Sequence, residues 1–235
     1  MNTDTIARSV IGTPHARTPR PSSESTVFIV DEDPLVCESL ELLIEAQGWH
    51  TETFASAEEF LARPRLPGPS CLILDVELPG LSGLELQGRV AIERPDMPVI
   101  FLSAYSDVRT GVQAMKAGAI EFLTKPVNDD AILSGVRQAF ERSCRVLAHE
   151  AKMTALRGSY ASLTRREREV MVLVASGLLN KQVAGELGIS EITVKAHRGQ
   201  VMRKMNASSL PALVNMAGSL ELAPEVTPQR AQEHP

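Results

Sequence analysis

Residues 27–33 read Val-Phe-Ile-Val-Asp-Glu-Asp, so four apolar residues are followed at once by three carboxylates. Similar apolar runs follow at residues 71–74 (Cys-Leu-Ile-Leu) and 99–102 (Val-Ile-Phe-Leu). Continuous runs of this length are typical of strands that are buried on both faces of a parallel sheet. Weaker strand patterns occupy residues 51–54 and 121–123. Together these five segments predict a parallel sheet.

The segments between these runs show helical spacing. Val108, Val112 and Met115, for example, mark a helix that Gly118 ends, and Ser56 is placed to cap an earlier one. Five strand–helix repeats within residues 26–140 are the pattern of an open, doubly wound α/β sheet.

Polar residues follow four of the five predicted strands: Asp31 and Glu32 after the first, Asp75 after the third, Ser103 after the fourth and Lys125 after the fifth. Ligands of doubly wound sheets bind outside these strand ends. Neighbouring carboxylates repel one another and need a cation or a proton, and an all-oxygen site suits Mg²⁺, with Mn²⁺ as the alternative. Asp75 is then a candidate phosphoryl acceptor, with Lys125 and Ser103 stabilising the phosphoryl oxygens.

The charge is distributed unevenly along the chain. The formal net charge of −5 argues against nucleic acid as a partner. Residues 26–130, however, carry seven Lys and Arg against eighteen Asp and Glu, whereas residues 159–222 carry eight against five. An acidic half and a basic half are expected to meet different partners.

Composition excludes several classes of protein. No run of about 18 apolar residues occurs, which excludes a membrane span. Cys37, Cys71 and Cys144 form no close pair, which excludes a disulfide scaffold and a Cys-rich zinc module and favours the cytoplasm. Residues 1–25 and 223–235 lack periodicity and are predicted to be disordered tails.

The C-terminal part of the chain shows only helical patterns. Thr164 and Glu167 have the spacing of a capping box. Asn180 is expected to cap the next helix, Gly188 to make a tight turn, and Ser190 to cap a longer helix. A helix, a short turn with glycine and a second helix form a helix-turn-helix pattern.

The helix after Ser190 has two faces. At 100° per residue, Val194, Val201 and Met205 fall on one side and are expected to face the core. The opposite side, which a recognition helix presents to the major groove, carries Ile192, Lys195, Ala196, Gly199 and Arg203. The predicted DNA-binding residues are Lys181, Thr193, Lys195, Ala196, Arg198, Gly199 and Arg203.

Residues 26–139 resemble the receiver domain of two-component response regulators, through residues 27–33, Leu-Asp75-Val-Glu-Leu-Pro79-Gly80, Leu-Ser103-Ala and Phe122-Leu-Thr-Lys125-Pro. The resemblance implies a flavodoxin-like sheet of strand order 2-1-3-4-5 and a sensor histidine kinase that phosphorylates Asp75. It also implies the remaining roles: Asp31, Glu32, Asp75 and the backbone carbonyl of Glu77 as metal ligands, and Ser103 and Phe122 as the switch pair. Glu32 departs from the family pattern, which has Asp there, and its longer side chain puts metal affinity in question.

Residues 163–210 resemble the LuxR-type helix-turn-helix of NarL/FixJ-type regulators, through Leu-Thr164-x-Arg-Glu167, Asn180-Lys181-Gln-Val-Ala and Ser190-Glu-Ile-Thr-Val-Lys195-Ala-His. The resemblance implies a four-helix domain whose last helix begins near Ser209, with groove contacts at Lys195, Ala196 and Gly199. Because Ala196 and Gly199 have almost no side chain, base recognition here must depend on other residues or on methyl contacts.

The expected organisation is a tail (1–25), a receiver domain (26–140), a helical linker (141–158), a DNA-binding domain (159–222) and a second tail (223–235). The expected function is that of a cytoplasmic, DNA-binding transcriptional response regulator. Phosphorylation of Asp75 is expected to produce a homodimer that activates transcription on double-stranded DNA. RNA polymerase is a further candidate partner, and no membrane is involved.

Two alternatives stay open. The first is a DNA-binding regulator that works without phosphorylation, which Glu32 favours. The second is an aspartyl-phosphate phosphotransferase, an enzyme that would need a general acid two residues after its nucleophile. Glu77 stands at that position instead of Asp, which indicates a backbone role and argues against the enzyme.

Overall fold

The computed structural model describes residues 25–105 and 107–222, and the chain divides into two compact units near residue 147. No helix in those described ranges is long and apolar enough to cross a membrane. The two predicted tails, except for residue 25, lie outside the described residues.

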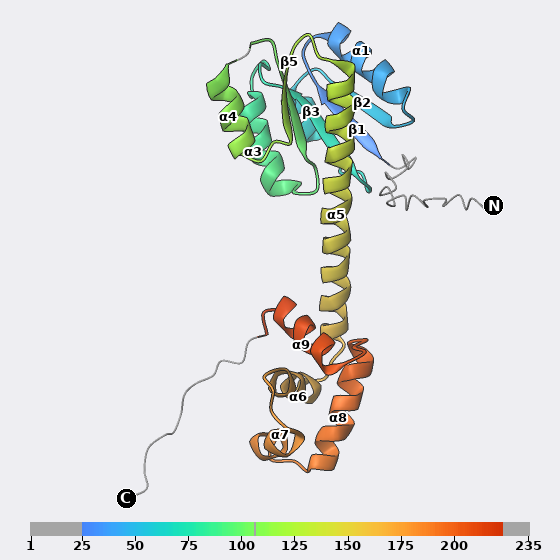
Figure 1. The fold of residues 1–235 in the computed structure, drawn as a ribbon, viewed down its shortest axis with the longest axis vertical. Coiled ribbons are helices and arrows are strands. Elements are labelled where there is room, and N and C mark those ends of the chain that lie inside the picture. The colour runs from blue at the N-terminus through green and yellow to red at the C-terminus, as the bar shows by residue number, and fades with distance from the viewer. Residues whose placement is uncertain (1–24, 106, 223–235) are drawn as a thin grey trace, which may run out of the picture. The chain divides into compact units, whose positions relative to one another are not determined.

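The first unit is built on a five-stranded parallel sheet (Figure 1). Its strands are β1 (Thr26–Val30), β2 (His50–Phe54), β3 (Ser70–Asp75), β4 (Val99–Ser103) and β5 (Glu121–Thr124). The strand order is β2-β1-β3-β4-β5, and every neighbouring pair is parallel. The predicted doubly wound fold and strand order are confirmed.

Helices cover both faces of this sheet. They are α1 (Pro34–Glu45), α2 (Ala57–Ala62), α3 (Gly83–Glu93), α4 (Val108–Lys116) and α5 (Asp129–Ala161). Helices α1 and α5 pack on the side of Val27, Ile29 and Ile73, while α2, α3 and α4 pack on the side of Phe28, Leu72 and Phe101. The strands alternate between two apolar layers, which explains their continuous hydrophobicity.

Helix α4 forms where its spacing predicted, but its apolar stripe does not face the core. Val108, Val112 and Met115 are 78%, 48% and 45% exposed, and Ala114 is the residue of α4 that is buried. With Phe122 and Thr124 these side chains line an open apolar groove of about 600 Å³ beside β5.

Helix α5 runs without interruption from Asp129 to Ala161, so the segment 141–158, predicted as a helical linker, is part of one long helix. Within the first unit it buries Ile132, Val136 and Phe140 against the sheet.

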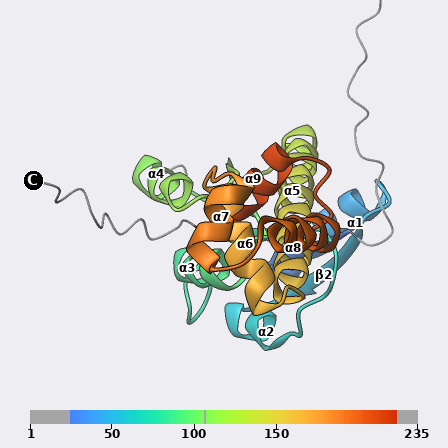
Figure 2. The same cartoon turned by 90° about the horizontal axis from the view of Figure 1, so that it is seen from below.

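The second unit is helical. Besides the end of α5 it contains α6 (Arg165–Ala175), α7 (Asn180–Leu187), α8 (Glu191–Lys204) and α9 (Leu210–Ser219). Helices α6 and α7 pack on α8, and α9 packs on α6 (Figure 2).

Local signals place most of these helix ends. The capping box of Thr164 and Glu167, the N-cap at Ser190 and the left-handed turn at Gly188 (φ 64°) are as predicted. The last helix was expected to begin near Ser209, and Ser209 is the N-cap of α9. The predicted cap at Asn180 is wrong. Leu179 is the N-cap residue of α7, and the Asn180 side chain instead accepts a hydrogen bond from Arg198 (3.2 Å).

Gly83, the first residue of α3, should not tolerate a side chain. A Cβ there would lie 2.2 Å from the backbone oxygen of Asp75, so either α3 or the end of β3 must move. We expect Gly83→Ala to lower the free energy of unfolding by roughly 1–3 kcal/mol in urea denaturation. Gly88→Ala is the matched control on the same helix, because a Cβ there meets nothing within 4 Å. It should be neutral or stabilising by up to about 1 kcal/mol, and equal losses in both variants would contradict this assignment.

Candidate functional site

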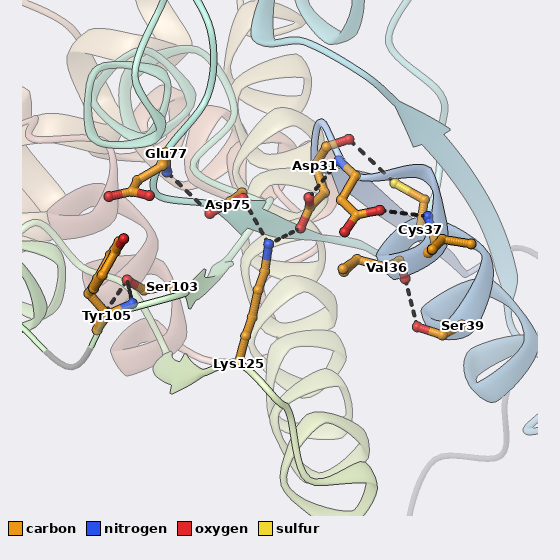
Figure 3. Close-up of polar contacts among 11 residues, drawn as sticks. Asp31, Val36, Cys37, Ser39, Asp75, Glu77, Ser103, Tyr105 and Lys125 are labelled. Atoms are coloured by element: carbon orange, nitrogen blue, oxygen red, sulfur yellow. Dashed lines mark hydrogen bonds and ion pairs between the residues drawn. The ribbon is translucent and has the colours of Figure 1, made fainter.

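The sheet register brings the predicted site residues together. In the pairing of β1 with β3, Val30 lies beside Leu74, so Asp31 and Asp75 emerge next to each other at the carboxyl edge. Both carboxylates are almost completely buried, with side chains 1% and 8% exposed. Lys125 follows the last residue of β5 and reaches back toward them from the far side of β4 (Figure 3).

A single ammonium group joins the two carboxylates. Nζ of Lys125 donates to Oδ2 of Asp31 (2.6 Å) and to Oδ2 of Asp75 (2.8 Å), as Figure 3 shows. The other oxygen of Asp75, Oδ1, accepts from the backbone N–H of Glu77 (3.1 Å). Asp75 is therefore held at both oxygens.

One cation does not neutralise two buried carboxylates. Burial raises the pKa of Asp31, and the neighbouring charge of Asp75 adds to that effect. Hydrogen bonds from Lys125 and from the backbone N–H of Asp33 oppose the rise but do not cancel it. For Lys125, burial lowers the pKa, but the two carboxylates outweigh it and raise the pKa overall. The lysine thus stays charged and the site keeps an excess of negative charge.

The other acidic residues of the first loop do not join this cluster. Asp33 accepts a hydrogen bond from the backbone N–H of Leu35 (2.9 Å) and caps α1, so one of its oxygens is occupied. Glu32 is exposed. Asp31 and Asp75 are the two carboxylates that share the ammonium.

The donor set fits Mg²⁺ in kind. Two carboxylates with room for water and a backbone carbonyl are what this small, hard cation takes in proteins. In the described part of the chain, no group of three or more His, Cys, Asp or Glu side chains is arranged to hold a metal. Asp31 and Asp75 are the carboxylates that this structure already brings together, and a metal ion bound to them would compete with Lys125 for their oxygens.

Ser103 follows Leu102, the strand partner of Asp75, and Phe122 pairs with Phe101. The hydrogen bonds of Asp75 go to Lys125 and to the backbone of Glu77, not to Ser103. The hydroxyl of Ser103 donates to the backbone oxygen of Tyr105 (2.8 Å) and accepts from its N–H (3.2 Å), so it is turned into the loop after β4 (Figure 3). Phe122 is half-buried against Phe101, with 6.3 Å between ring centroids, and faces the groove beside α4.

In the second unit, α8 has the two faces that its sequence predicts. Val194, Val201 and Met205 are 0%, 1% and 2% exposed, so they form the core side. The predicted groove-facing residues of α8 are all exposed: Ile192, Lys195, Ala196, Gly199 and Arg203. Thr193, also predicted to bind DNA, is exposed as well. Lys181 is exposed at the start of α7.

Several of these polar side chains already have partners. Arg198 is half-buried and donates to Asn180, which joins α8 to α7. Lys195 pairs with Glu191 at 3.4 Å, but both are exposed, and such a pair is readily broken. The hydroxyl of Thr193 shares a hydrogen bond with Ser190 at the start of α8 (2.8 Å).

Sequence reasoning missed two supporting contacts. Lys204 donates to Glu167 (2.7 Å) and to the backbone oxygen of Ser162 (3.3 Å), which ties the end of α8 to the start of α6. Tyr105 supplies the backbone groups that hold Ser103. No pattern in the sequence marks either contact, because each depends on how loops and helices meet in space.

Comparison with known proteins gives two family matches. Residues 27–137 match the response regulator receiver domain, and residues 161–217 match the bacterial regulatory proteins of the luxR family. Nodulation protein W of Bradyrhizobium diazoefficiens is 42% identical over 208 residues, covering 88% of this chain and 92% of that protein. The transcriptional regulatory protein FixJ of Azorhizobium caulinodans is 40% identical, covering 84% and 94%. A solved structure of the response regulator StyR matches with a TM-score of 0.75, at 42% identity over 83% of this chain and 98% of that one.

The chain belongs to the two-component response regulators. It is a FixJ-like transcriptional regulator with a LuxR-family DNA-binding domain, and this family places it among transcription factors rather than among enzymes. The receiver domain implies a histidine kinase as partner, and the helix-turn-helix implies DNA.

The excess negative charge in the receiver pocket should lower the stability of this response regulator. We expect Asp31→Asn to raise the free energy of unfolding at pH 7 by roughly 1 kcal/mol, measured by urea denaturation. The raised pKa of Asp31 means that its ionisation is less favourable in the folded than in the unfolded chain. That cost is fully present above the raised pKa and disappears as the pH falls below the unfolded value of about 3.9. The advantage of the variant should therefore shrink in acid.

Asp33→Asn is the matched control. Asp33 is exposed and caps α1, and asparagine caps a helix about as well as aspartate. Stability should change little in this variant at any pH. Equal gains in both variants would show that the effect is not specific to the buried pair.

Proposed function

We propose that Asp75 accepts a phosphoryl group from a sensor histidine kinase and that phosphorylation controls DNA binding through α8. One observation carries the first half: a buried carboxylate at the end of β3 lies 2.8 Å from a lysine ammonium that also binds Asp31. Such a site holds a carboxylate nucleophile beside an ammonium group that can pair with phosphoryl oxygens.

The transfer follows from these contacts. An oxygen of Asp75 attacks the phosphorus of the kinase phosphohistidine, a P–O bond forms, the P–N bond breaks, and the imidazole leaves. The N–H of Glu77 and the ammonium of Lys125 orient the carboxylate, and each oxygen keeps an unshared electron pair for the attack. Lys125 then neutralises part of the added charge.

Mg²⁺, or Mn²⁺ in its place, completes this site. We assign its ligands to Asp31, Asp75, Glu32 and the backbone carbonyl of Glu77. When bound, the cation would neutralise the phosphoryl oxygens during transfer. The exposed Glu32 is the weakest of these ligands, because it lies outside the pair of buried carboxylates that share Lys125.

Ser103 and Phe122 form the proposed switch. The hydroxyl of Ser103 exchanges its hydrogen bond with Tyr105 for one to a phosphoryl oxygen on Asp75. Tyr105 moves with it. Phe122 then changes its packing at the groove beside α4, which it lines. A new charge at one site thus biases a two-state element nearby.

The same change is proposed to favour a homodimer that activates transcription, with RNA polymerase as a further partner. The exposed stripe of Val108, Val112 and Met115 on α4 offers apolar surface that a second receiver domain would bury. A dimer would present two copies of α8 to half-sites one or more helical turns apart. We place this activity in the cytoplasm, where its kinase and DNA partners meet and where three unpaired cysteines are stable.

Phosphorylation is tested by mass. After treatment with a small-molecule phosphodonor and Mg²⁺, the wild-type protein should gain one phosphoryl group, and Asp75→Asn should gain none. Asp33→Asn, which removes an exposed carboxylate from the same edge of the sheet, should be modified like the wild type. Sedimentation of the same samples should show a dimer only where the phosphoryl group is present. Modification of Asp75→Asn, or a monomer after full modification, would overturn the corresponding part of the proposal.

A second candidate is a regulator that binds DNA equally well without phosphorylation. The exposure of Glu32, at a position where the family has Asp, favours it. It would be supported if the wild-type protein resists modification and still binds a specific duplex.

DNA binding through α8 is tested at Lys195. Using a duplex selected from a random library by the full-length protein, we expect Lys195→Ala to weaken binding roughly 10-fold. The matched control is Lys152→Ala, which removes an exposed lysine from α5 and should leave the affinity unchanged. Equal effects of the two substitutions would mean that Lys195 contributes only to the general charge.

A further inference from the structure

Helix α8 carries one large apolar side chain on its exposed side. Ile192 is 80% exposed, although it stands in the first turn, two residues before the fully buried Val194. A single exposed isoleucine is ordinary on a protein surface. Ile192, however, stands on the side of α8 that was predicted to face the major groove.

The residues that follow Ile192 on the same side of α8 have small side chains. Ala196 and Gly199 follow it at i+4 and i+7, so the three residues form one stripe along the helix. A Cβ at Gly199 would meet nothing within 4 Å, and Ala196 is exposed. The helix backbone can therefore approach a partner closely, with Ile192 projecting furthest.

The charges around the stripe fit a polyanion. Lys195 and Arg203 are exposed on the same side of α8, and Lys181 is exposed at the start of α7. These cations suit phosphate contacts on either side of a groove. The N-terminal residues of a recognition helix, where Ile192 stands, are those that meet base edges.

Polar side chains near Ile192 are mostly committed within the protein. The hydroxyl of Thr193 is bonded to Ser190, and Arg198 donates to Asn180. Lys195 has a long side chain whose ammonium group can donate hydrogen bonds, and its partner is the exposed Glu191. Beside Lys195, the large exposed side chain of the stripe is Ile192, which offers only hydrocarbon.

An isoleucine distinguishes bases in the major groove by one chemical feature. Thymine presents a C5 methyl group there, whereas cytosine presents an N4 amino group in the same region. Ile192 can pack against the methyl group but offers no acceptor to the amino group, which would lose its water.

We propose that Ile192 is a specificity-determining residue that recognises the C5 methyl group of a thymine in each half-site, adjacent to the base pair that Lys195 contacts. This inference rests on the proposed function, in which α8 enters the major groove. It adds the class of base that the stripe recognises.

The test uses the full-length protein and duplexes selected from a random library. Each thymine of one half-site is replaced in turn by deoxyuridine, which removes only the methyl group. At one position the wild-type protein should lose affinity roughly four-fold, the equivalent of one buried methyl group. Ile192→Ala should bind the thymine duplex several-fold more weakly and should show no further loss with deoxyuridine at that position.

Ile92→Ala is the matched control, because Ile92 is an isoleucine on α3 that is 84% exposed in the receiver unit. This variant should keep both the affinity and the sensitivity to deoxyuridine. If Ile192→Ala remains as sensitive as the wild type, or no thymine methyl matters, the proposal is wrong even though DNA binding stands. If no duplex is selected, or if Lys195→Ala binds the selected duplex as tightly as the wild type, the groove-binding role of α8 fails, and this inference fails with it.

Discussion

The receiver unit depends on one shared cation. Two buried carboxylates from neighbouring strands face each other, and the Lys125 ammonium is hydrogen-bonded to both. The parallel pairing of β1 with β3 forces the carboxylates together, and β5 must lie beyond β4 for the lysine to reach them. The arrangement leaves negative charge uncompensated. This uncompensated charge makes folding less favourable. In the proposed function, the same charge attracts the metal cation that would assist phosphoryl transfer.

In the second unit, the basic residues are separated from the apolar core. Its basic residues need not be neutralised within the fold, since α8 buries Val194 and Val201 on one side and leaves Lys195 and Arg203 exposed on the other. The contact between Lys204 and Glu167 fixes the end of this helix against α6. The net charge of the whole chain, −5, conceals both features, because it adds the charge of an acidic receiver to that of a basic DNA-binding unit.

Periodicity predicted the elements better than the direction they face. Helical phase predicted the two faces of α8 correctly, because three bulky apolar residues lie on its core side and few apolar residues lie on its exposed side. In α4 the same reasoning fails: Val108, Val112 and Met115 form an apolar stripe that turns away from the sheet, and the small Ala114 packs inside. Which residues of α4 are buried depends on how closely α4 packs against the sheet, and helical spacing does not specify that distance. Likewise, Asn180 is a residue type that often caps helices, but here its side chain accepts a hydrogen bond from Arg198 instead.

The sequence by itself determined the doubly wound sheet, the helix-turn-helix and the residues at the strand ends, because these depend on local patterns and on the rule that parallel strands end at one edge. The strand order was expected only from the resemblance to receiver domains. Only the tertiary structure decided which of these residues touch. Asp31, Asp75 and Lys125 meet, Asp33 caps a helix, and Ser103 turns toward Tyr105. Contacts between side chains 50 or 94 residues apart depend on packing at the ångström scale, which no local pattern records.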